Sequence, residues 1–344
     1  MTPCSHRRRV GAHRLGDRPV TGAVDLSYAG SMRVAFVTTD DPSVTDEDVD
    51  RPAHERAFAA ADIDLEYRSW TMAADWDAYD LVVIRSPWDY PERTVDFLAW
   101  LRSVEHLPTL MNPAPLISWN LDKRYLAELD HAGVPTVPTG FADSLRRVDA
   151  LLGAQADRSR PGGSSGEVVV KPTISAGSRN TGRFAVDDPA ARALAELILG
   201  AGGTVMIQPA IASVAERGEV GVIVFDGEIS HAIVKAPILD VGGTLLGGSY
   251  REAITAADPT PAQREATMAA VDVVASIAAH KRWLSDDEPL LYGRYDLVSL
   301  NDGTEALLEA ELFEPSFFLD TDPDSPARFV EAVRRRAIAV AERR

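Results

Sequence analysis

Residues 292–318 read Tyr-Gly-Arg-Tyr-Asp-Leu-Val-Ser-Leu-Asn-Asp-Gly-Thr-Glu-Ala-Leu-Leu-Glu-Ala-Glu-Leu-Phe-Glu-Pro-Ser-Phe-Phe. Two largely apolar segments flank Asn301-Asp302-Gly303, a turn sequence typical of a β-hairpin. Asp296 lies on the first strand. Glu309 and Glu311 lie two residues apart on the second strand and therefore face the same side. The stretch predicts a hairpin that carries carboxylates inside apolar strands.

Carboxylates in apolar strands are costly to bury unless a cation accompanies them. Mg²⁺ prefers oxygen ligands and commonly shares them with the phosphates of a substrate. We therefore expect Asp296, Glu309 and Glu311 to bind metal. Arg294 lies on the same face as Asp296 and is expected to meet an anionic group. An edge hairpin with its acids in water explains this stretch alone equally well, so the rest of the chain must decide.

The composition is that of a globular protein. The 344 residues are 45% hydrophobic and 25% charged, and this length favours two or three subdomains. The net charge of −17 argues against nucleic acid or an anionic membrane as the main partner. Cys4 is the only cysteine, which excludes a disulfide framework and a cysteine metal site. No run of about 18 apolar residues is present, and we expect a cytoplasmic protein.

The first 31 residues differ from the rest of the chain. They carry five arginines against two acids, with too few apolar residues to form a core. They also lack the apolar segment and the cleavage site of a signal peptide. We expect residues 1–31 to be a disordered N-terminal extension, or Met32 to be the natural start.

Short apolar strands then alternate with helices, which indicates an α/β subdomain over residues 32–115. We expect a strand at 33–39, a helix at 52–61 and a fully apolar strand of a parallel sheet at 81–84. No glycine fingerprint of a dinucleotide-binding fold follows the early strands, and the sequence contains no Walker A motif.

Arg85-Ser-Pro-Trp-Asp-Tyr90 follows the apolar strand, at the edge where ligands bind in open α/β sheets. We expect this loop to face the substrate. Arg85 would hold a carboxylate, with Ser86, Trp88 and Asp89 beside it. A loop fastened only by the packing of Trp88 and Tyr90 is the alternative interpretation.

Lysines and a glycine loop occupy the middle of the chain. Asn120 is expected to cap a helix over 121–130, which places Lys123 in the first turn. A cation is poorly placed there on dipole grounds, so Lys123 has either another task or a solvated side chain. A β-branched strand ends in Lys171 and leads into the small residues 175–182, whose backbone N–H groups can approach a phosphate closely.

The polar positions run in chain order from lysines through the glycine loop to the acids: Lys123, Lys171, 175–182, Gln208, Glu219, Lys235, Arg294, Asp296, Glu309 and Glu311. This order resembles that of the ATP-grasp ligases, over roughly residues 33–320. The resemblance implies an ATP-grasp fold, α/β overall and α+β in the ATP-binding part, with nucleotide held between two β-sheets. Its three subdomains would span 32–115, 116–209 and 210–344, the last with the metal hairpin.

The resemblance also implies roles for single residues. Contacts with ATP phosphates are implied for Lys123 and Lys171 and for the loop that contains Ser175 and Gly177. An adenine-binding hinge is implied for Gln208, Pro209, Ala210 and Ile211, and ribose binding for Glu216 or Glu219. Catalytic roles are implied for Arg294 and Lys235, and metal binding for Asp296, Glu309 and Glu311. Glu311 stands where the family usually has Asn, which adds negative charge.

A narrower resemblance lies in Ile84-Arg-Ser-Pro-Trp-Asp-Tyr-Pro91, Asn112-Pro-Ala-Pro115, Trp119-Asn-Leu-Asp-Lys123 and the segment 309–318. These stretches are similar to an actinobacterial ATP-grasp subgroup, in which D-cycloserine-forming cyclo-ligases (O-ureido-serine cyclases) occur. The subgroup implies a role in antibiotic biosynthesis.

The resemblance implies that ATP activates a carboxylate as an acyl phosphate, which a nitrogen nucleophile then attacks, with release of ADP and phosphate. The implied cofactors are ATP and Mg²⁺, with two ions and Mn²⁺ as a substitute. The implied partner is a small amino-acid-like carboxylate, bound by a monomer or a homodimer. One alternative is an inactive ATP-grasp module that only binds nucleotide. Another is an unrelated α/β enzyme. The presence of Lys171, Asp296 and Glu309 argues against the inactive module, which need not keep all three.

Overall fold

The structure is a computed structural model that describes residues 31–45, 48–158, 166–237, 239, 242–245, 253–285 and 288–343. The predicted disordered extension, residues 1–31, lies outside these ranges except for Ser31. Met32–Arg344 form one compact unit, which contains all the elements described here. Within the described ranges, no helix is long and apolar enough to cross a membrane.

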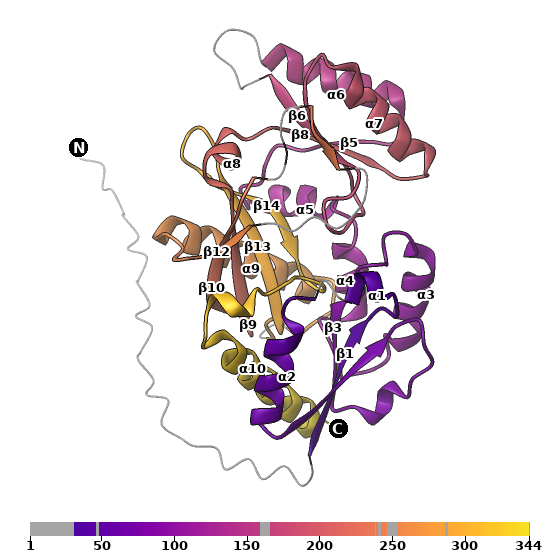
Figure 1. The fold of residues 1–344 in the computed structure, drawn as a ribbon, viewed down its shortest axis with the longest axis vertical. Helices are drawn as coiled ribbons and strands as arrows, with labels where there is room; N and C mark the ends of the chain where they lie inside the picture. The colour runs from indigo at the N-terminus through magenta and orange to yellow at the C-terminus, as the bar shows by residue number, and fades with distance from the viewer. Residues whose placement is uncertain are drawn as a thin grey trace, which may run out of the picture. The chain divides into compact units, whose positions relative to one another are not determined.

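A parallel sheet of four strands begins the fold, in the order β2-β1-β3-β4 (Figure 1). Its strands are β1 (Met32–Thr38), β2 (Ile63–Ser69), β3 (Leu81–Ser86) and β4 (Leu110–Met111). The helices between them are α1 (Pro42–Thr45), α2 (Arg51–Ala60), η1 (Trp76–Ala78) and α3 (Thr94–Val104). Every residue of β3 is buried, as expected of a central strand covered on both faces. The predicted α/β arrangement is confirmed.

One face of this sheet is covered by the last helix of the chain, α10 (Ser325–Arg343), together with α2 (Figure 1). The ring of Phe36 on β1 lies 5.2 Å from that of Phe58 on α2 and 6.2 Å from that of Phe329 on α10. The same core contains Ile223 and Tyr292 from another sheet. The beginning and the end of the fold therefore share one hydrophobic core.

A second sheet is antiparallel, in the order β11-β7-β6-β8-β5. Its strands are β5 (Gly140–Ala142), β6 (Glu167–Pro172), β7 (Thr181–Ala185), β8 (Val205–Pro209) and β11 (Thr244–Leu245). The helices α6 (Leu145–Arg158) and α7 (Pro189–Gly200) pack on it (Figure 1). Asp188 caps α7 by accepting a hydrogen bond from the backbone N–H of Ala190, 2.8 Å away.

The third sheet carries the hairpin expected at 292–313 and has the order β12-β10-β9-β13-β14. Its strands are β9 (Glu219–Phe225), β10 (Glu228–Lys235), β12 (Ile254–Ala257), β13 (Tyr292–Ser299) and β14 (Glu305–Glu311). Beside them lie α8 (Ala212–Arg217), α9 (Pro261–His280) and η2 (Leu319–Thr321). Asp226 and Gly227, the turn between β9 and β10, both have positive φ, as this hairpin turn requires.

The helix predicted over 121–130 begins later than expected, so the predicted start is wrong. Asn120 is instead the last residue of α4 (Ala114–Asn120), and the next helix is α5 (Tyr125–His131). The Asn120 amide bonds to β14 and the residue after it: its Nδ2 donates to Ala310 O and its Oδ1 accepts from Leu312 N, both at 2.9 Å. Because the third sheet occupies this side chain, it cannot cap a helix, and Lys123 lies between two helices.

The second sheet has a core with α6 and α7, whereas the first and third sheets share one, and we propose that the subdomains follow these cores. Leu116, Leu126 and Val134 pack with Val222 and Leu307 of the third sheet. The segment expected to begin the central subdomain at residue 116 therefore belongs by its packing with 210–344. On this proposal the second sheet, from β5 onward, is the central subdomain.

Candidate active site

A cavity of about 900 Å³ is lined by residues of the second and third sheets and of the loop after β3. Most of the residues singled out in the sequence line it: Trp88, Lys123, Lys171, Ser175, Gly177, Gln208, Pro209, Ala210, Ile211, Glu219, Lys235, Arg294, Glu309 and Glu311. Five of them lie outside the lining: Arg85, Ser86, Asp89, Glu216 and Asp296. The hairpin is therefore a wall of a cavity between two sheets and not a solvated edge.

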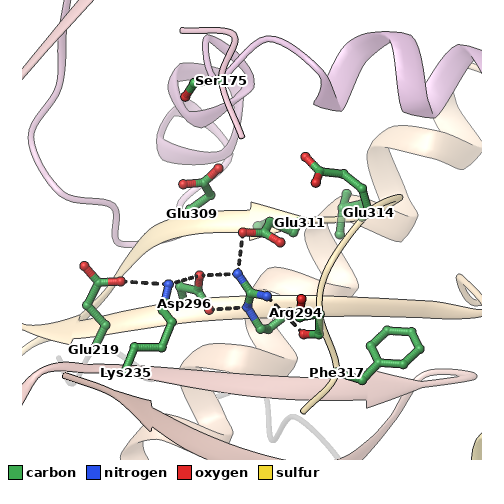
Figure 2. A network of polar contacts seen from close by, with 12 residues as sticks. Ser175, Glu219, Lys235, Arg294, Asp296, Glu309, Glu311, Glu314 and Phe317 are labelled. Atoms are coloured by element: carbon green, nitrogen blue, oxygen red, sulfur yellow. Dashed lines mark hydrogen bonds and ion pairs between the residues drawn. The ribbon is translucent and has the colours of Figure 1, made fainter. Parts of the chain in front are cut away.

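The floor of the cavity is a buried ion network (Figure 2). Arg294 Nε lies 2.9 Å from Asp296 Oδ1, and Lys235 Nζ lies 2.8 Å from Asp296 Oδ2 and 3.0 Å from Glu219 Oε2. Burial alone would raise the pKa of Asp296, but Arg294 and Lys235 together hold it well below its usual range. Asp296 is 1% exposed and lies outside the cavity lining, paired with both cations; its predicted role as a metal ligand stays a prediction.

The other two predicted metal ligands do line the cavity. Glu309 Oε1 lies 2.9 Å from Lys123 Nζ, and Glu311 accepts a hydrogen bond from Arg294 Nη2. Burial would raise the pKa of Glu309, but Lys123 and Lys171 lower it below its ordinary value. Burial raises the pKa of Glu311 to about 7, against the opposing effect of Arg294. Two neighbouring acids therefore face the cavity with opposite pKa shifts.

No group of three or more carboxylate, imidazole or thiolate side chains that could hold a metal ion is present among the described residues. The site of Asp296, Glu309 and Glu311 expected from the sequence is therefore not assembled by protein ligands alone. Glu309 and Glu311 supply carboxylate oxygens, which suit Mg²⁺ when a substrate supplies the other ligands.

Lys171 is the cation of the cavity that stands apart. It lies near the end of β6 and is half-buried, and its side chain forms no hydrogen bond or ion pair with any residue that the structure describes. Burial lowers the pKa of Lys171 below its ordinary value, although Glu309 acts in the opposite direction. A cavity-facing ammonium whose side chain has no direct ion-pair partner among the described residues suits an anionic ligand.

The loop expected to cover phosphates follows Lys171. Gly177, Ser178 and Asn180 all have positive φ, and Lys123 Nζ donates to Ser175 O at 3.0 Å. Non-glycine residues seldom adopt positive φ, and such residues cluster at ligand-binding sites. Lys123 thus joins this loop to Glu309 of the hairpin.

The predicted hinge lies in the cavity wall together with one of the two candidate ribose-binding acids, and the other acid lies outside that wall. Pro209, Ala210 and Ile211 line the cavity, and the Gln208 side chain donates to Thr139 Oγ1 at 2.9 Å. Glu219 lines the cavity, whereas Glu216 lies exposed on α8. The geometry therefore favours Glu219 between the two acids that the sequence left open.

The loop after β3 reaches the cavity through its aromatic residues. Trp88 Nε1 donates to Glu314 O at 2.9 Å, and Tyr90 Oη donates to Glu314 Oε1 at 2.8 Å. Asp89 instead accepts from Trp70 Nε1 at 2.8 Å, and Ser86 Oγ donates to Asp48 Oδ2 at 2.9 Å. Asp89 and Ser86 therefore serve the fold, which corrects the expectation that both face the substrate.

Arg85 also departs from its expected role. Its side chain is 1% exposed, and its Nη2 lies 3.6 Å from Asp50 Oδ2. Its guanidinium carbon lies 3.6 Å from the centroid of the Phe317 ring. The segment after the hairpin covers the end of β3, so Arg85 is sealed behind Phe317 and does not reach the cavity. A contact with a substrate carboxylate is therefore no longer expected of it.

Sequence reasoning missed three acids of the cavity wall, Asp50, Glu314 and Asp320. Burial raises the pKa of Glu314 to about 8, and the charge of Glu311 adds to this rise. Figure 2 shows Glu309, Glu311 and Glu314 along β14 and the loop after it. Glu314 could have been found from its place three residues after Glu311. Nothing near Asp50 in the sequence indicates its hydrogen bonds with the backbone of Phe317 and Leu319.

The chain is similar to proteins of cycloserine biosynthesis. Residues 34–112 match the family model of the N-terminal domain of D-cycloserine synthetase DcsG. The cycloserine biosynthesis protein DcsG of Streptomyces lavendulae is 37% identical over 298 residues, which cover 84% of this chain and 94% of that protein. The crystal structure of D-cycloserine synthetase DcsG has a TM-score of 0.78 at 36% identity, covering 89% of this chain and 99% of that one.

More distant solved structures share the fold. D-alanine–D-alanine ligase from Bacillus anthracis has a TM-score of 0.62 at 13% identity, covering 91% of this chain and 99% of that one. The ATP-grasp ligase PsnB, complexed with minimal precursor, Mg and ADP, has a TM-score of 0.55 at 16% identity and covers 88% of this chain and 98% of its own. The ATP-grasp fold expected from the sequence is therefore confirmed.

Proposed function

Because this chain belongs to the D-cycloserine synthetase (DcsG) family of ATP-grasp ligases, we propose that it activates the carboxylate of an amino-acid-like substrate with ATP and closes a ring on a nitrogen of the same molecule. The carboxylate oxygen takes the γ-phosphoryl group as the bond to ADP breaks. The nitrogen then forms the amide bond as phosphate leaves. The products are the cyclic amide, ADP and phosphate.

Lys171 is the observation that carries this proposal. Burial disfavours the charge of Lys171 more than Glu309 favours it, and an anion bound beside this half-buried cation would offset that cost. The triphosphate of ATP is such an anion. Lys123 and the covering loop line the same cavity as Lys171. Charge-assisted contacts of this kind are about twice as strong as neutral hydrogen bonds.

Glu309 and Glu311 fit Mg²⁺ because both present carboxylate oxygens to the cavity beside Lys171 and Lys123. When bound, Mg²⁺ neutralises charge on the phosphates and orients them. A metal that shares these two carboxylates with the phosphates of a substrate would arrive with the nucleotide. Two ions, and Mn²⁺ as a substitute, remain part of this proposal.

Arg294 is the residue proposed to stabilise the charge that develops during transfer. Its guanidinium is fixed on three sides: by Asp296, by Glu311 and by the carbonyl of Ser316, which accepts from Nη1 at 3.0 Å. A donor held in place before the reaction stabilises developing charge without reorganising. Lys235 holds Asp296 from the other side and so keeps the arginine in register.

The acceptor substrate is proposed to lie on the side of the cavity that Trp88 and Glu314 line, where Trp88 Nε1 donates to Glu314 O. Glu314 forms no ion pair with any residue in the described ranges, and its hydrogen-bond donor there is the neutral Tyr90 hydroxyl. The ammonium or N–H donor of an amino-acid-like substrate would favour the ionised form of Glu314, whose pKa is about 8 without it, and would form a charge-assisted contact with that form. In this proposal Glu314 contacts the acceptor substrate through its nitrogen group, and Arg85, expected from the sequence to hold the substrate carboxylate, does not contact the substrate.

The test is turnover with Mg·ATP and either enantiomer of O-ureido-serine, alongside a panel of D- and L-amino acids. We expect ADP and phosphate, with a cyclic product visible by mass spectrometry. Arg294→Lys should bind nucleotide but turn over slowly. AMP and pyrophosphate, or nucleotide binding without turnover on any substrate, would contradict the proposal. The second outcome would favour a module that only binds nucleotide.

A further inference from the structure

Asp50 directly precedes α2, where an aspartate ordinarily accepts a hydrogen bond from its own helix. Its side chain forms no such bond. Its Oδ2 accepts from the backbone N–H of Phe317 at 2.5 Å and its Oδ1 from that of Leu319 at 2.8 Å. Asp50 is 1% exposed. This side chain is therefore committed to a segment more than 260 residues away.

The residue between those two amides has a strained backbone. Phe318 has φ 53° and ψ 48°, the left-handed region, which its Cβ disfavours because it approaches the carbonyl oxygen. Non-glycine residues stay in this region only where their surroundings hold them. The two hydrogen bonds to Asp50 flank Phe318 on either side and supply that restraint.

Arg85 supports this arrangement from behind. Its Nη2 pairs with Asp50 Oδ2, and its guanidinium stacks on the ring of Phe317. Its Nε and Nη1 are buried and have no hydrogen-bond partner among the described residues. Among the described residues, the side chain of Arg85 thus pairs with the carboxylate that holds the segment, and its nearest ring is Phe317 of that segment.

The same segment touches the arginine of the reaction site. The carbonyl of Ser316 accepts from Arg294 Nη1 at 3.0 Å, and the Phe318 ring centroid lies 5.8 Å from the Arg294 guanidinium carbon. A change in the backbone between Ser316 and Leu319 would therefore move one of the groups that orient Arg294.

We propose that Asp50, supported by Arg85, positions Arg294 for phosphoryl and acyl transfer by holding residues 316–319 in their strained conformation. This inference rests on the proposed function, because it takes Arg294 as the residue that stabilises the developing charge. Asp50 precedes α2 and Arg85 lies on β3, so on this proposal the N-terminal α/β part of the fold contributes to the reaction through Arg294 and not only through the substrate. Direct binding of the substrate by Asp50 is the competing role, since Asp50 also lines the cavity.

Steady-state kinetics separates the two roles. We expect Asp50→Asn to lower kcat about tenfold while KM for ATP and for the amino-acid substrate stays within about twofold, because an interaction used only in the transition state is lost. In an Arg294→Lys background the same substitution should cost about twofold or less, since the residue it acts through is already changed. A rise in the substrate KM, or an equal loss in both backgrounds, would overturn the proposal.

Hydrogen exchange tests the restraint without any turnover. In Asp50→Asn the amides of Phe317 and Leu319 should exchange about tenfold faster, because each loses an acceptor or gains a weaker one. Glu55→Gln, an exposed acid on the same helix, is the matched control and should change neither amide. Adding Phe318→Gly to Asp50→Asn should restore part of the protection, because glycine adopts positive φ freely.

The two hypotheses fail in different ways. Unchanged exchange of both amides in Asp50→Asn overturns the positioning role whatever the enzyme's activity. Faster exchange, in a parent protein that shows no ligase turnover, supports the restraint and overturns the proposed function instead.

Discussion

Lys123 Nζ lies 2.9 Å from Glu309 Oε1, so the lysine between α4 and α5 forms an ion pair with the second strand of the hairpin. Lys123 is nearly buried, and its side chain also donates to the loop at Ser175. Burial would lower the pKa of Lys123, but Glu309 raises it above its ordinary value. Each of the three acids of the hairpin thus has a cationic partner. Neutralising one of them should therefore change the stability of the folded protein.

Glu309→Gln should destabilise the nucleotide-free protein by about 1–3 kcal/mol at pH 7, because it leaves the Lys123 ammonium buried without its partner. The folded pKa of Glu309 lies below its ordinary value of 4.5, so its stabilising effect is present above pH 4.5 and disappears as pH falls through the folded value. Urea denaturation of parent and variant at pH 7 and at about pH 3.5 would measure this. Equal stabilities of the two proteins at pH 7 would contradict the prediction.

Lys171→Met should have the opposite effect on stability. The pKa of Lys171 is lowered by burial, so its charge disfavours folding below that pKa and the penalty fades as pH rises through it. We expect the variant to be equally or more stable at pH 7, while its affinity for Mg·ATP falls by about 2–3 kcal/mol. Calorimetry and thermal denaturation measure the two effects. Lys281→Met, which removes a surface ion pair with Glu128, should leave the nucleotide affinity unchanged; a parallel loss in both variants would count against a phosphate contact.

Glu219→Gln should weaken binding of ATP roughly tenfold, because this acid lines the cavity and could accept from the ribose hydroxyls. Glu216→Gln is the matched control, five residues from Ile211 on the exposed side of α8, and should bind ATP like the parent. Titration with a fluorescent ATP analogue and with its 2′,3′-dideoxy form would locate the contact. The assignment fails if Glu219→Gln loses equal affinity for both analogues.

Glu314→Gln should change the pH dependence of stability. The folded pKa of Glu314 is about 8 against an ordinary 4.5, so the folded state holds a proton that the unfolded state releases, and stability falls as pH rises from 4.5 to about 8. The amide stays neutral and can still accept from Tyr90. We expect the variant to exceed the parent by about 1–4 kcal/mol, with the largest gain above pH 8. Melting temperatures at pH 5, 7 and 9 check this, and a constant difference between the two proteins would refute it.

Local patterns predicted the elements that carry the site. The Asp-Gly turns, the β-branched strand ending in Lys171 and the apolar strand before Arg85 all occur where their sequences indicate them. Glu309 and Glu311 share a face because alternation in a strand is a local property. Element type and the order of the polar residues were therefore accessible from the sequence.

Contacts between distant segments were not accessible in the same way. Arg85 was placed correctly at the end of its strand, yet the segment around Phe317 covers it, and no local pattern shows this. Asn120 failed as a helix cap because β14 occupies its amide. Asp296 was correctly placed on its strand, but its two cations hold it below the cavity surface. In each case a partner far along the chain decided where the side chain points.

The shared core of the first sheet and α10 also bears on how the protein is made. The N-terminal strands and α2 leave the ribosome first, but Phe36 and Phe58 meet Phe329 only after residues 325–343 have been synthesised. Until then the part of this sheet face that α10 covers stays exposed. Its apolar side chains can then aggregate or bind chaperones. The earliest part of this fold to be synthesised must therefore be among the last to reach its final packing, and a ribosome that stalls before α10 would release a chain with that face exposed.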